Sequence, residues 1–328
     1  MLAVLMFGAA HDITGGGTAV DLHLLENIVA IADERSITRA AERRFVTQSA
    51  LNQQLAKLEE ELGAPLFVRS RSNWQPTEAG RAYLAAARQM LLLKKDAYAR
   101  IAECAEKGKR RMTVGLIPER GVDMFTAVYP AFHRAFPHIQ VEPVECHVTA
   151  MQRMITAGHL DLGLATLTKA QRDDNDYHLM AQEEILLAVP SGLALAEGGS
   201  ADWHDAPLTQ LSRFAQEPFV RIYHRSTLYS LTQALFEQAG FEPQVLFSTA
   251  SSVSKYRIVS LGLGCALLPA TYAHSDGSVV YFRLPQRPAW QITMCSRRGA
   301  YLSEPEQCYL DLCRAYWTDR QNRGPDAL

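Results

Sequence analysis

The sequence lacks the patterns that mark several common classes of protein. It has six cysteines but no C-x-x-C motif and no cluster of cysteine and histidine at zinc-finger spacing, which argues against a zinc site. No apolar run reaches the ~18 residues that a membrane-spanning helix needs. The apolar residues 1–10 are not preceded by the basic segment of a signal peptide. We therefore expect a cytoplasmic protein with reduced thiols and no disulfides, metal ion or membrane contact.

A large charge excess is also missing. The 33 lysines and arginines are balanced by 35 aspartates and glutamates, for a net charge of -2. This balance excludes a uniformly basic coat for nucleic acid but leaves room for a local basic face. Hydrophobic residues make up 48% of the 328 residues, as in globular proteins, and this length predicts two or three domains at ~150 residues each.

The motifs of common enzymes are missing as well. The chain has no G-x-S-x-G, G-x-x-x-x-G-K or H-E-x-x-H, the patterns of hydrolases, P-loop proteins and zinc proteases. Gly262-Leu263-Gly264 resembles part of a dinucleotide fingerprint, but the residues after it look like a strand rather than a helix. The sequence therefore predicts neither an enzyme nor a bound cofactor.

Residues 21–62 have the periodicity of three helices. Ser36 and Thr47 stand where N-caps would begin the second and the third helix. Gly63 and Pro65 end the third helix. Two short helices joined by a tight turn, with the second one longer, are the layout of a helix-turn-helix.

The next segment is typical of a β-wing. Residues 66–69 are strand-like, residues 70–73 form a polar and basic turn, and Trp74-Gln75 resumes the extended pattern. Such a pair of short strands beside a helix-turn-helix predicts a winged domain.

A long helical pattern begins at Pro76-Thr77 and extends to about Glu106. Its apolar residues recur at heptad spacing, with Lys94 in the one gap. These residues are Tyr83, Ala87, Met90, Ala97, Ile101 and Cys104. A helix of ~30 residues is about 45 Å long. The seam favours pairing with a second copy of the chain; the alternative is that the helix packs on its own domain.

From Met112 onward, strand-like runs alternate with helical ones. The strand-like runs are 112–117, 139–144, 160–166, 184–190, 219–223, 244–249 and 279–284. The helical stretches include one that Pro137 ends, one at 227–239, one from Ser251 or Ser252 to near Gly262, and a last one that begins with a capping box of Ser303 and Glu306. This alternation predicts a largely parallel α/β architecture.

Four linked blocks resemble a known family. They are SITRAAE at 36–42, TQSAL at 47–51, LEEELGAPLFVR at 58–69 and PTEAG at 76–80. Their order and spacing are similar to those of the amino-terminal domain of LysR-type transcriptional regulators. DLGLA at 161–165 and LGLGCALLP at 261–269 resemble parts of that family's effector-binding domain.

The resemblance covers roughly residues 21–318 and implies a fold of the α plus α/β class. A winged helix-turn-helix and a dimerising linker helix are followed by a two-lobed effector-binding domain of the periplasmic-binding-protein type 2. The winged helix-turn-helix is expected at 21–80 and the linker helix at 77–108. The first lobe is expected at 111–183 and 281–320, and the second lobe at 184–280. Residues 1–20 are expected to be a tail outside the fold, or the product of a start codon placed too early, with translation beginning near Val20.

The third helix is the expected DNA-reading element. A recognition helix inserts its amino-terminal half into the major groove, and here that half carries Thr47, Gln48, Ser49, Asn52 and Gln53. Asparagine and glutamine suit bidentate pairing with adenine. The alternative for Gln48 and Gln53 is a solvated helix face. The family commonly has arginine at the position of Gln53 and serine at that of Asn52, so relatives do not indicate the operator sequence.

Basic residues cluster around this helix although the domain as a whole is not basic. Residues 35 to 57 contain five basic residues and one acidic residue. We expect Arg39, Arg69, Arg71 and also Arg43 to contact phosphates, which positions the domain without reading sequence.

The effector site follows from the resemblance. It places in the cleft between the lobes Pro118, Glu119, Arg120, Gly121, Thr149, Arg221, Tyr223 and His224. Many relatives carry serine or threonine where this chain has Glu119-Arg120. This charged pair either receives a zwitterionic or hydrogen-bond-rich ligand, or pairs with itself on the rim. Thr149 at a helix start, with the basic residues of the second lobe, favours an anionic metabolite.

The sequence thus predicts a transcriptional regulator that binds double-stranded operator DNA and responds to a small-molecule effector. It is expected to form a homodimer through the linker helix and a homotetramer from two dimers. The alternatives are a solute receptor of the periplasmic type and an enzyme with an appended DNA-binding head. The missing export signal and the missing enzyme motifs disfavour them.

Overall fold

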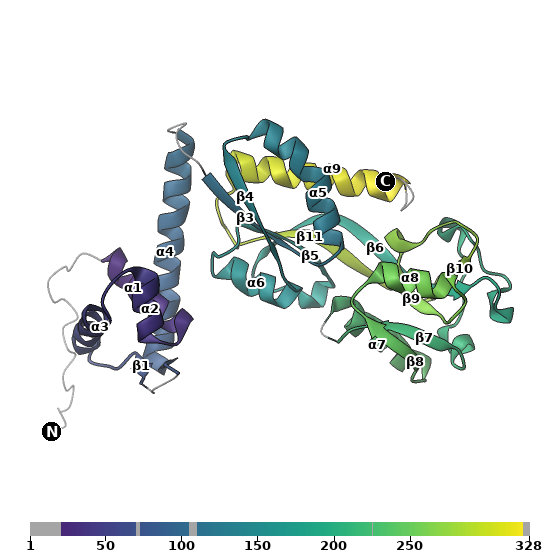
Figure 1. Cartoon of the computed structure of the whole chain (residues 1–328), viewed down its shortest axis with the longest axis horizontal. Coiled ribbons are helices and arrows are strands. Elements are labelled where there is room, and N and C mark those ends of the chain that lie inside the picture. Colours follow the sequence, from purple (N-terminus) through teal and green to yellow (C-terminus); the bar gives the residue numbers. More distant parts are fainter. Residues whose placement is uncertain (1–20, 70–72, 105–109, 225, 324–328) are drawn as a thin grey trace, which may run out of the picture. The chain divides into compact units, whose positions relative to one another are not determined.

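A computed structural model describes residues 21–69, 73–104, 110–224 and 226–323. These residues form two units, one ending at Tyr98 and the other beginning at Ala99 (Figure 1). The predicted tail at 1–20 lies outside the described residues. No helix in the described ranges is long and apolar enough to cross a membrane.

The first unit is a winged helix-turn-helix. Its elements are α1 (Leu22–Glu34), α2 (Ile37–Arg44), α3 (Gln48–Leu62), β1 (Phe67–Val68), β2 (Gln75–Pro76) and the first part of α4 (Glu78–Cys104). The predicted caps are confirmed: the Ser36 hydroxyl accepts from the Arg39 N–H and the Thr47 hydroxyl from the Ala50 N–H at 3.2 Å. Gly63 ends α3 with a φ of 66°, a left-handed conformation that glycine adopts without strain.

A small apolar core holds the helices of this unit together. Ile28 and Ile31 of α1 and Leu51 and Leu55 of α3 are completely buried, because residues at helical spacing share one face. Leu84 joins this core from α4. At the start of α4, Gly80 lies so near β1 that a Cβ would come within 1.9 Å of the Leu66 carbonyl oxygen. Only glycine therefore allows α4 to begin at this place.

The heptad seam of α4 divides into two parts. Ala87 is buried and the seam residue Tyr83 packs against the core of the helix-turn-helix, as the own-domain alternative predicts. Farther along, Met90 and Ile101 are 40% and 64% exposed, and the nearby Leu93 and Tyr98 are exposed too. The own-domain alternative thus describes the first part of the helix, and pairing with a second copy stays a prediction for the exposed part.

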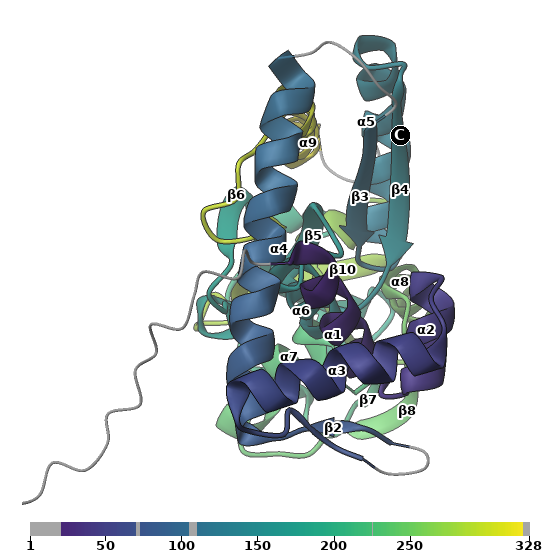
Figure 2. The same cartoon turned by 90° about the vertical axis from the view of Figure 1, so that its left-hand side faces the viewer.

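The second unit contains a seven-stranded sheet in the order β10-β6-β11-β5-β3-β4, with β9 also paired to β6. The strands are β3 (Arg110–Leu116), β4 (Ile139–Glu145), β5 (Leu162–Leu167), β6 (Asp176–Pro190), β9 (Ala266–Pro269), β10 (Val279–Phe282) and β11 (Ala289–Ser296). A separate pair is formed by β7 (Pro218–Ile222) and β8 (Gln244–Thr249). Figure 2 shows β3 and β4 side by side.

The prediction of a largely parallel sheet is wrong. Strands β3, β4 and β5 pair in parallel, as do β7 and β8. Strands β6, β9, β10 and β11 pair only antiparallel in the described part of the chain. One cause is β11, which the sequence pattern did not reveal and which lies between β5 and β6, opposite in direction to both. In addition, β9 and β10 run opposite to β6.

Helices cover this sheet and the β7–β8 pair. They are α5 (Arg120–Ala135), α6 (Val148–Thr156), α7 (Thr227–Ala239), α8 (Ser252–Ser260) and α9 (Glu304–Arg323). Short 3-10 turns lie at Lys169–Gln171, Ala194–Ala196, Trp203–Asp205, Leu211–Phe214 and Ala270–Tyr272. Figure 1 shows α5 and α9 on one side of the sheet and α6 on the other. Of the expected capping box, the Glu306 carboxylate accepts from the Ser303 N–H at 2.7 Å.

The second unit has two main apolar cores. One contains Val114, Phe132, Leu164, Met294 and Trp317. The other contains Leu187, Phe219, Phe236, Leu267 and Phe282. Strand β6 contributes to both, with Ala181 in the first and Ile185 in the second. The two cores are thus separate although β6 runs through both, and a cleft can lie between them.

Candidate DNA-reading face and effector cleft

The polar edge of α3 is exposed as predicted. Thr47, Gln48, Ser49 and Gln53 are exposed and Asn52 is half-buried. Thr47 caps the helix, and the amide oxygen of Gln48 accepts from the Thr38 hydroxyl at 3.1 Å. The side chains of Ser49, Asn52 and Gln53 make no hydrogen bond to other residues in the described ranges. These three are therefore available to a partner outside the chain.

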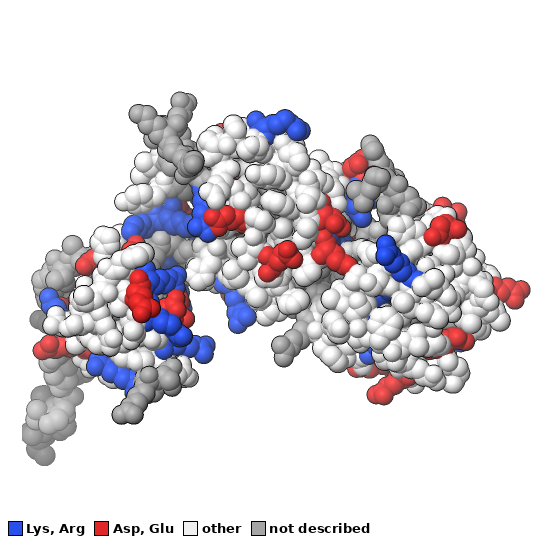
Figure 3. Space-filling view, in the orientation of Figure 1, with Lys and Arg blue, Asp and Glu red and all other residues white. Residues whose placement is uncertain are grey.

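Three of the arginines that we expect to contact phosphate form ion pairs with acidic residues of the chain. Arg69 lies 2.6 Å from a carboxylate oxygen of Glu59, and Arg43 lies 3.1 Å from Glu34, which also contacts Arg39. Over the face shown in Figure 3, basic and acidic side chains lie next to each other. The arginines of these pairs are 50–61% exposed, and ion pairs at the surface contribute only ~0–1 kcal/mol each, so phosphate can replace the acidic partners. Arg71 lies outside the described residues.

Two further residues of this unit are free, and sequence reasoning did not single them out. Arg35 and Phe45 both have a left-handed backbone, with φ of 49° and 55°, at the ends of α1 and α2. Arg35 is exposed, its side chain has no partner among the described residues, and its carbonyl accepts from the Trp74 N–H of the wing. Phe45 is 96% exposed. An apolar residue in the turn before Thr47 was the one sequence signal for it.

A cavity of about 890 Å³ lies between the two cores of the second unit. Six of the eight residues that the resemblance placed in the cleft line it. They are Pro118, Glu119, Arg120, Thr149, Tyr223 and His224. The cavity is large enough for a small metabolite.

The other two residues do not line this cavity. Gly121 instead lets α5 approach β3, since a Cβ there would lie 3.1 Å from the backbone of Leu116. Arg221 donates to Gln233 at 2.8 Å, and its guanidinium lies over the ring of Tyr229. These contacts assign packing roles to both residues, and a direct effector contact stays a prediction for each.

The side chains of Glu119 and Arg120 do not pair with each other, so the rim interpretation is wrong, and the ligand interpretation stays a prediction. A carboxylate oxygen of Glu119 accepts from the Ser252 N–H at the start of α8, at 3.0 Å. Its backbone is strained, with φ of 58°. Arg120 instead forms an ion pair with Glu183, and the two side chains are 5% and 3% exposed.

The Arg120–Glu183 pair is fully enclosed. Glu183 also accepts from the Trp290 indole N–H at 2.6 Å and from the Thr271 N–H at 2.9 Å. Burial is the largest influence and works against its charge, but the Arg120 guanidinium and the hydrogen bonds from Thr271 and Trp290 together outweigh burial and hold the pKa of Glu183 below its usual value. Both groups are therefore charged, and Arg120 is not free to bind a ligand.

Sequence reasoning missed the hydroxyl groups of the cavity wall. Thr166 and Ser252 line the cavity, are more than nine-tenths buried, and have no hydrogen-bond partner for their hydroxyls among the described residues. A neighbouring hydroxyl, that of Thr227, donates to the Thr166 carbonyl at 2.8 Å. The sequence signal for the Thr166 hydroxyl was weak, because a threonine within the apolar strand β5 is also typical of a buried sheet.

A buried lysine lies behind this wall. Lys255 of α8 is 1% exposed and donates to the Leu267 carbonyl. Burial lowers the pKa of Lys255 to about 7, with the positive Arg221 adding to the shift and Glu119 opposing it. Its ammonium group therefore exchanges its proton near neutral pH.

Comparison with known proteins agrees with this architecture. The model of the LysR substrate binding domain matches residues 105–318, and that of bacterial regulatory helix-turn-helix proteins of the lysR family matches residues 22–81. Among curated relatives, the uncharacterized HTH-type transcriptional regulator YcgK of Bacillus subtilis is 25% identical over 306 residues, 90% of this chain and 94% of that protein. The Hca operon transcriptional activator HcaR of Escherichia coli is 27% identical over 80% of this chain and 86% of its own.

Solved structures show the same fold. A full-length OxyR variant from Pseudomonas aeruginosa matches with a TM-score of 0.64 and 22% identity, over 90% of this chain and 98% of that one. Full-length BenM matches with a TM-score of 0.52 and 19% identity, over 94% of this chain and 100% of its own. The predicted combination of a helix-turn-helix domain and a two-lobed α/β domain is confirmed.

Proposed function

The chain belongs to the LysR family of bacterial helix-turn-helix regulators and is a DNA-binding transcriptional regulator with an effector-binding domain; we propose that α3 reads its operator through Thr47, Gln48, Ser49, Asn52 and Gln53. The observation that carries this proposal is the exposed polar edge of α3, where Ser49, Asn52 and Gln53 have no partner among the described residues. Free amide groups at the start of a recognition helix suit the edges of adenine.

Phosphate contacts are proposed for Arg39, Arg69 and Arg71, with Arg35 added from the structure. Arg35 needs no exchange of partners, whereas Arg39 and Arg69 must leave carboxylates in favour of phosphate. Each phosphate contact contributes about -0.9 to the slope of binding against salt concentration.

The effector is proposed to be an anionic metabolite in the cavity between the cores. The first turn of α6, with Thr149, lines this cavity, and its N-cap residue His147 makes no side-chain cap. The free N–H groups of such a turn attract an anion. Glu119 is the one acid among the described lining residues, and it is already bonded to α8.

The division of the effector-binding domain is proposed as predicted. Residues 111–183 and 281–320 form the first lobe, and residues 184–280 form the second. The two apolar cores support this division except at its last bound, because Phe282, Leu284 and Trp290 lie in the second core. Residues 77–108 are proposed as a dimerising linker, supported by the exposed apolar residues in the outer part of α4. Assembly into a homotetramer and a cytoplasmic location complete the proposal. The relatives named above are transcriptional regulators, which disfavours an enzyme or a free solute receptor.

Regulation then follows from the thermodynamic linkage between effector binding and DNA binding. An effector that binds one arrangement of the lobes more tightly shifts the population toward it. Coupling between two sites is usually worth 1–3 kcal/mol, and reciprocity requires operator DNA to alter effector affinity by the same factor.

Two binding experiments on the full chain test the proposal. Selection from a random duplex library should yield sequences that bind at least ~1000-fold more tightly than competitor DNA near physiological salt. In thermal unfolding, one of acetate, succinate or benzoate should stabilise the chain, by about 2.7 kcal/mol at 100 times its Kd, while the corresponding neutral amides should not. Binding without any sequence preference would refute the proposal that α3 reads an operator sequence. Stabilisation by the amides alone would refute the proposal of an anionic effector.

A further inference from the structure

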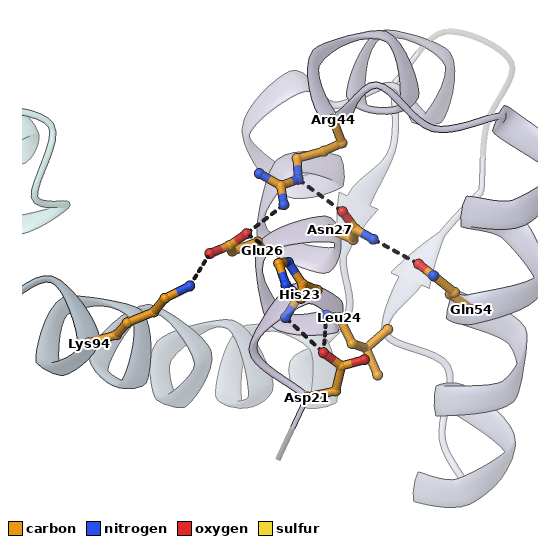
Figure 4. Close-up of polar contacts among 8 residues, drawn as sticks. All are labelled: Asp21, His23, Leu24, Glu26, Asn27, Arg44, Gln54 and Lys94. Carbon is orange, nitrogen blue, oxygen red and sulfur yellow. Dashed lines mark hydrogen bonds and ion pairs between the residues drawn. The ribbon is translucent and has the colours of Figure 1, made fainter. Parts of the chain in front are cut away.

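Lys94 interrupts the heptad seam of α4, and the structure shows where it goes. Its ammonium nitrogen lies 2.8 Å from a carboxylate oxygen of Glu26 on α1 (Figure 4). The lysine is thus a contact between the linker helix and the helix-turn-helix rather than a position of the exposed seam. The proposed function leaves this contact without a role.

Glu26 uses both carboxylate oxygens. One accepts from Lys94, and the other lies 2.5 Å from the Arg44 guanidinium of α2. The hydrogen bond from Lys94, together with Arg44, holds the pKa of Glu26 below its usual value despite partial burial. The three side chains are 24–29% exposed, so they are partly shielded from solvent and salt.

Asn27 carries the chain of contacts on to the recognition helix. It is 5% exposed, its amide oxygen accepts from Arg44 Nε at 2.9 Å, and its amide nitrogen donates to the Gln54 side-chain oxygen at 2.8 Å. Gln54 lies on α3 directly after the proposed base-reading residues Asn52 and Gln53. Hydrogen bonds therefore run without a break from α4 through α1 and α2 to α3, as Figure 4 shows.

We call these contacts the Lys94 network; its residues are Glu26, Asn27, Arg44, Gln54 and Lys94. The network lies away from the apolar contacts that attach α4 to the helix-turn-helix. Leu84 and Ala87 bury the first turns of α4, and Gly80 brings the helix against Leu66. Lys94 is fourteen residues beyond Gly80, which is about 20 Å along a helix. Apolar contacts at one end of a rod allow it to tilt, whereas directional hydrogen bonds farther along oppose the tilt.

We propose that the Lys94 network holds α3 at a set angle to α4, and so determines which spacing of operator half-sites a dimer accepts. The inference rests on the proposed function, in which α4 joins two copies and α3 reads DNA. In dimeric helix-turn-helix proteins the spacing of half-sites mirrors the placement of the two recognition helices. The five residues are positioning residues, because none of them needs to touch DNA.

The chain offers a matched control. Arg88 of α4 donates to Asp33 of α1 at 2.7 Å, so it joins the same two helices with the same charge. Among the described residues, no chain of hydrogen bonds leads from that contact to α3. Replacing Arg88 tests the effect of losing an α4–α1 ion pair and a positive charge, and replacing Lys94 additionally tests the connection to the recognition helix.

The experiment compares dissociation constants of the full chain for a selected duplex and for versions with one or two base pairs added or removed between half-sites. The variants are Lys94→Met, Lys94→Arg, Gln54→Met and Arg88→Met. Lys94→Met and Gln54→Met should each reduce the preference for the selected spacing by about fivefold or more, the low end of coupling between sites. Lys94→Arg and Arg88→Met should keep it, and binding to a single half-site should stay the same.

Two results would overturn the inference. One is a wild-type spacing preference that survives in both Lys94→Met and Gln54→Met. The other is an equal loss in Arg88→Met, which would assign the effect to the general attachment of α4. A wild-type chain that selects no duplex at all would instead overturn the proposed function, and the inference with it. Thermal unfolding of each variant verifies that it is folded, and Gln54→Met replaces Lys94→Met if the latter is not.

Discussion

The two ionic clusters of this protein differ in their access to solvent. In the helix-turn-helix unit, Glu26, Arg44 and Lys94 remain about one quarter exposed. In the effector-binding unit, Arg120 and Glu183 are almost completely enclosed. Water and salt can compensate for a broken contact in the first cluster, but they cannot reach a charge left alone in the second.

This difference indicates different purposes. Partly exposed contacts cost little to replace, which suits a domain whose arginines must meet phosphate, and the Lys94 network acts through the direction of its hydrogen bonds rather than through their strength. A buried pair is expensive to break, and Arg120–Glu183 lies where α5 and β6 meet Thr271 and Trp290 beside the cavity. We interpret it as the rigid frame of the effector cleft. The following changes test how far the two clusters differ.

The largest loss of stability is expected for Arg120→Met. It leaves the Glu183 carboxylate buried without its cation, which destabilises by about 3–5 kcal/mol. Urea unfolding of the effector-binding unit measures the change. The control is Arg111→Met, which removes an ion pair with Glu142 whose arginine is 65% exposed and should lose less than about 1 kcal/mol. Equal losses in the two variants would remove the contrast between the clusters.

A pH dependence is expected from Lys255. Its folded pKa of about 7 is below the 10.5 of the unfolded chain, so the unfolded state binds more protons between these values and stability rises with pH there. Below pH 7 the burial penalty is present in full. The melting temperature of Lys255→Met, relative to wild type, should therefore be highest near pH 6 and fall as pH increases toward 10. The control is Lys57→Met, which removes a lysine whose side chain is 79% exposed.

A moderate effect on DNA affinity is expected for Arg69→Ala. Loss of one phosphate contact should weaken binding to all sequences alike and reduce the steepness of the salt dependence by about 0.9. Glu59→Gln, which keeps an oxygen for the N–H groups of Leu66 and Phe67, should strengthen binding because Arg69 loses its competing carboxylate. Fluorescence anisotropy over a salt series tests both, and an unchanged slope in Arg69→Ala would contradict the contact.

The smallest effect concerns Glu119. Glu119→Ala removes the carboxylate from the start of α8 and keeps the strained backbone, whereas Glu119→Gly removes both. Because glycine adopts a φ of 58° without strain, Glu119→Gly should be more stable than Glu119→Ala by about 1 kcal/mol. Thermal unfolding of the two variants isolates the strain, and a reversed order would show that the loop relaxes on its own.

Much of the helix-turn-helix unit was predictable because its signals are local. Ser36, Thr47 and Gly63 act within one turn of their own helices, and the burial of α3 follows from helical spacing. The exposed edge of α3 could be predicted for the same reason. Strand β11 could not be found in this way, since its partners β5 and β6 lie far away in the chain.

The cleft residues were harder to place. Glu119 and Arg120 are adjacent in sequence, yet one bonds to α8 and the other to β6, because consecutive side chains at the start of a helix point in different directions. Lys94 is similar: its heptad position suggested a gap in a dimer seam, and its real partner is on α1. No periodicity within α4 contains that information.

The amino-acid sequence by itself determined the caps, the apolar helix faces and the family, because these depend on short-range backbone geometry and on the order of motifs. Only the tertiary structure decided which charges are paired, which hydroxyls line the cavity and how α4 connects to α3. Those outcomes depend on side chains brought together from distant segments, where burial determines whether a charge must have a partner.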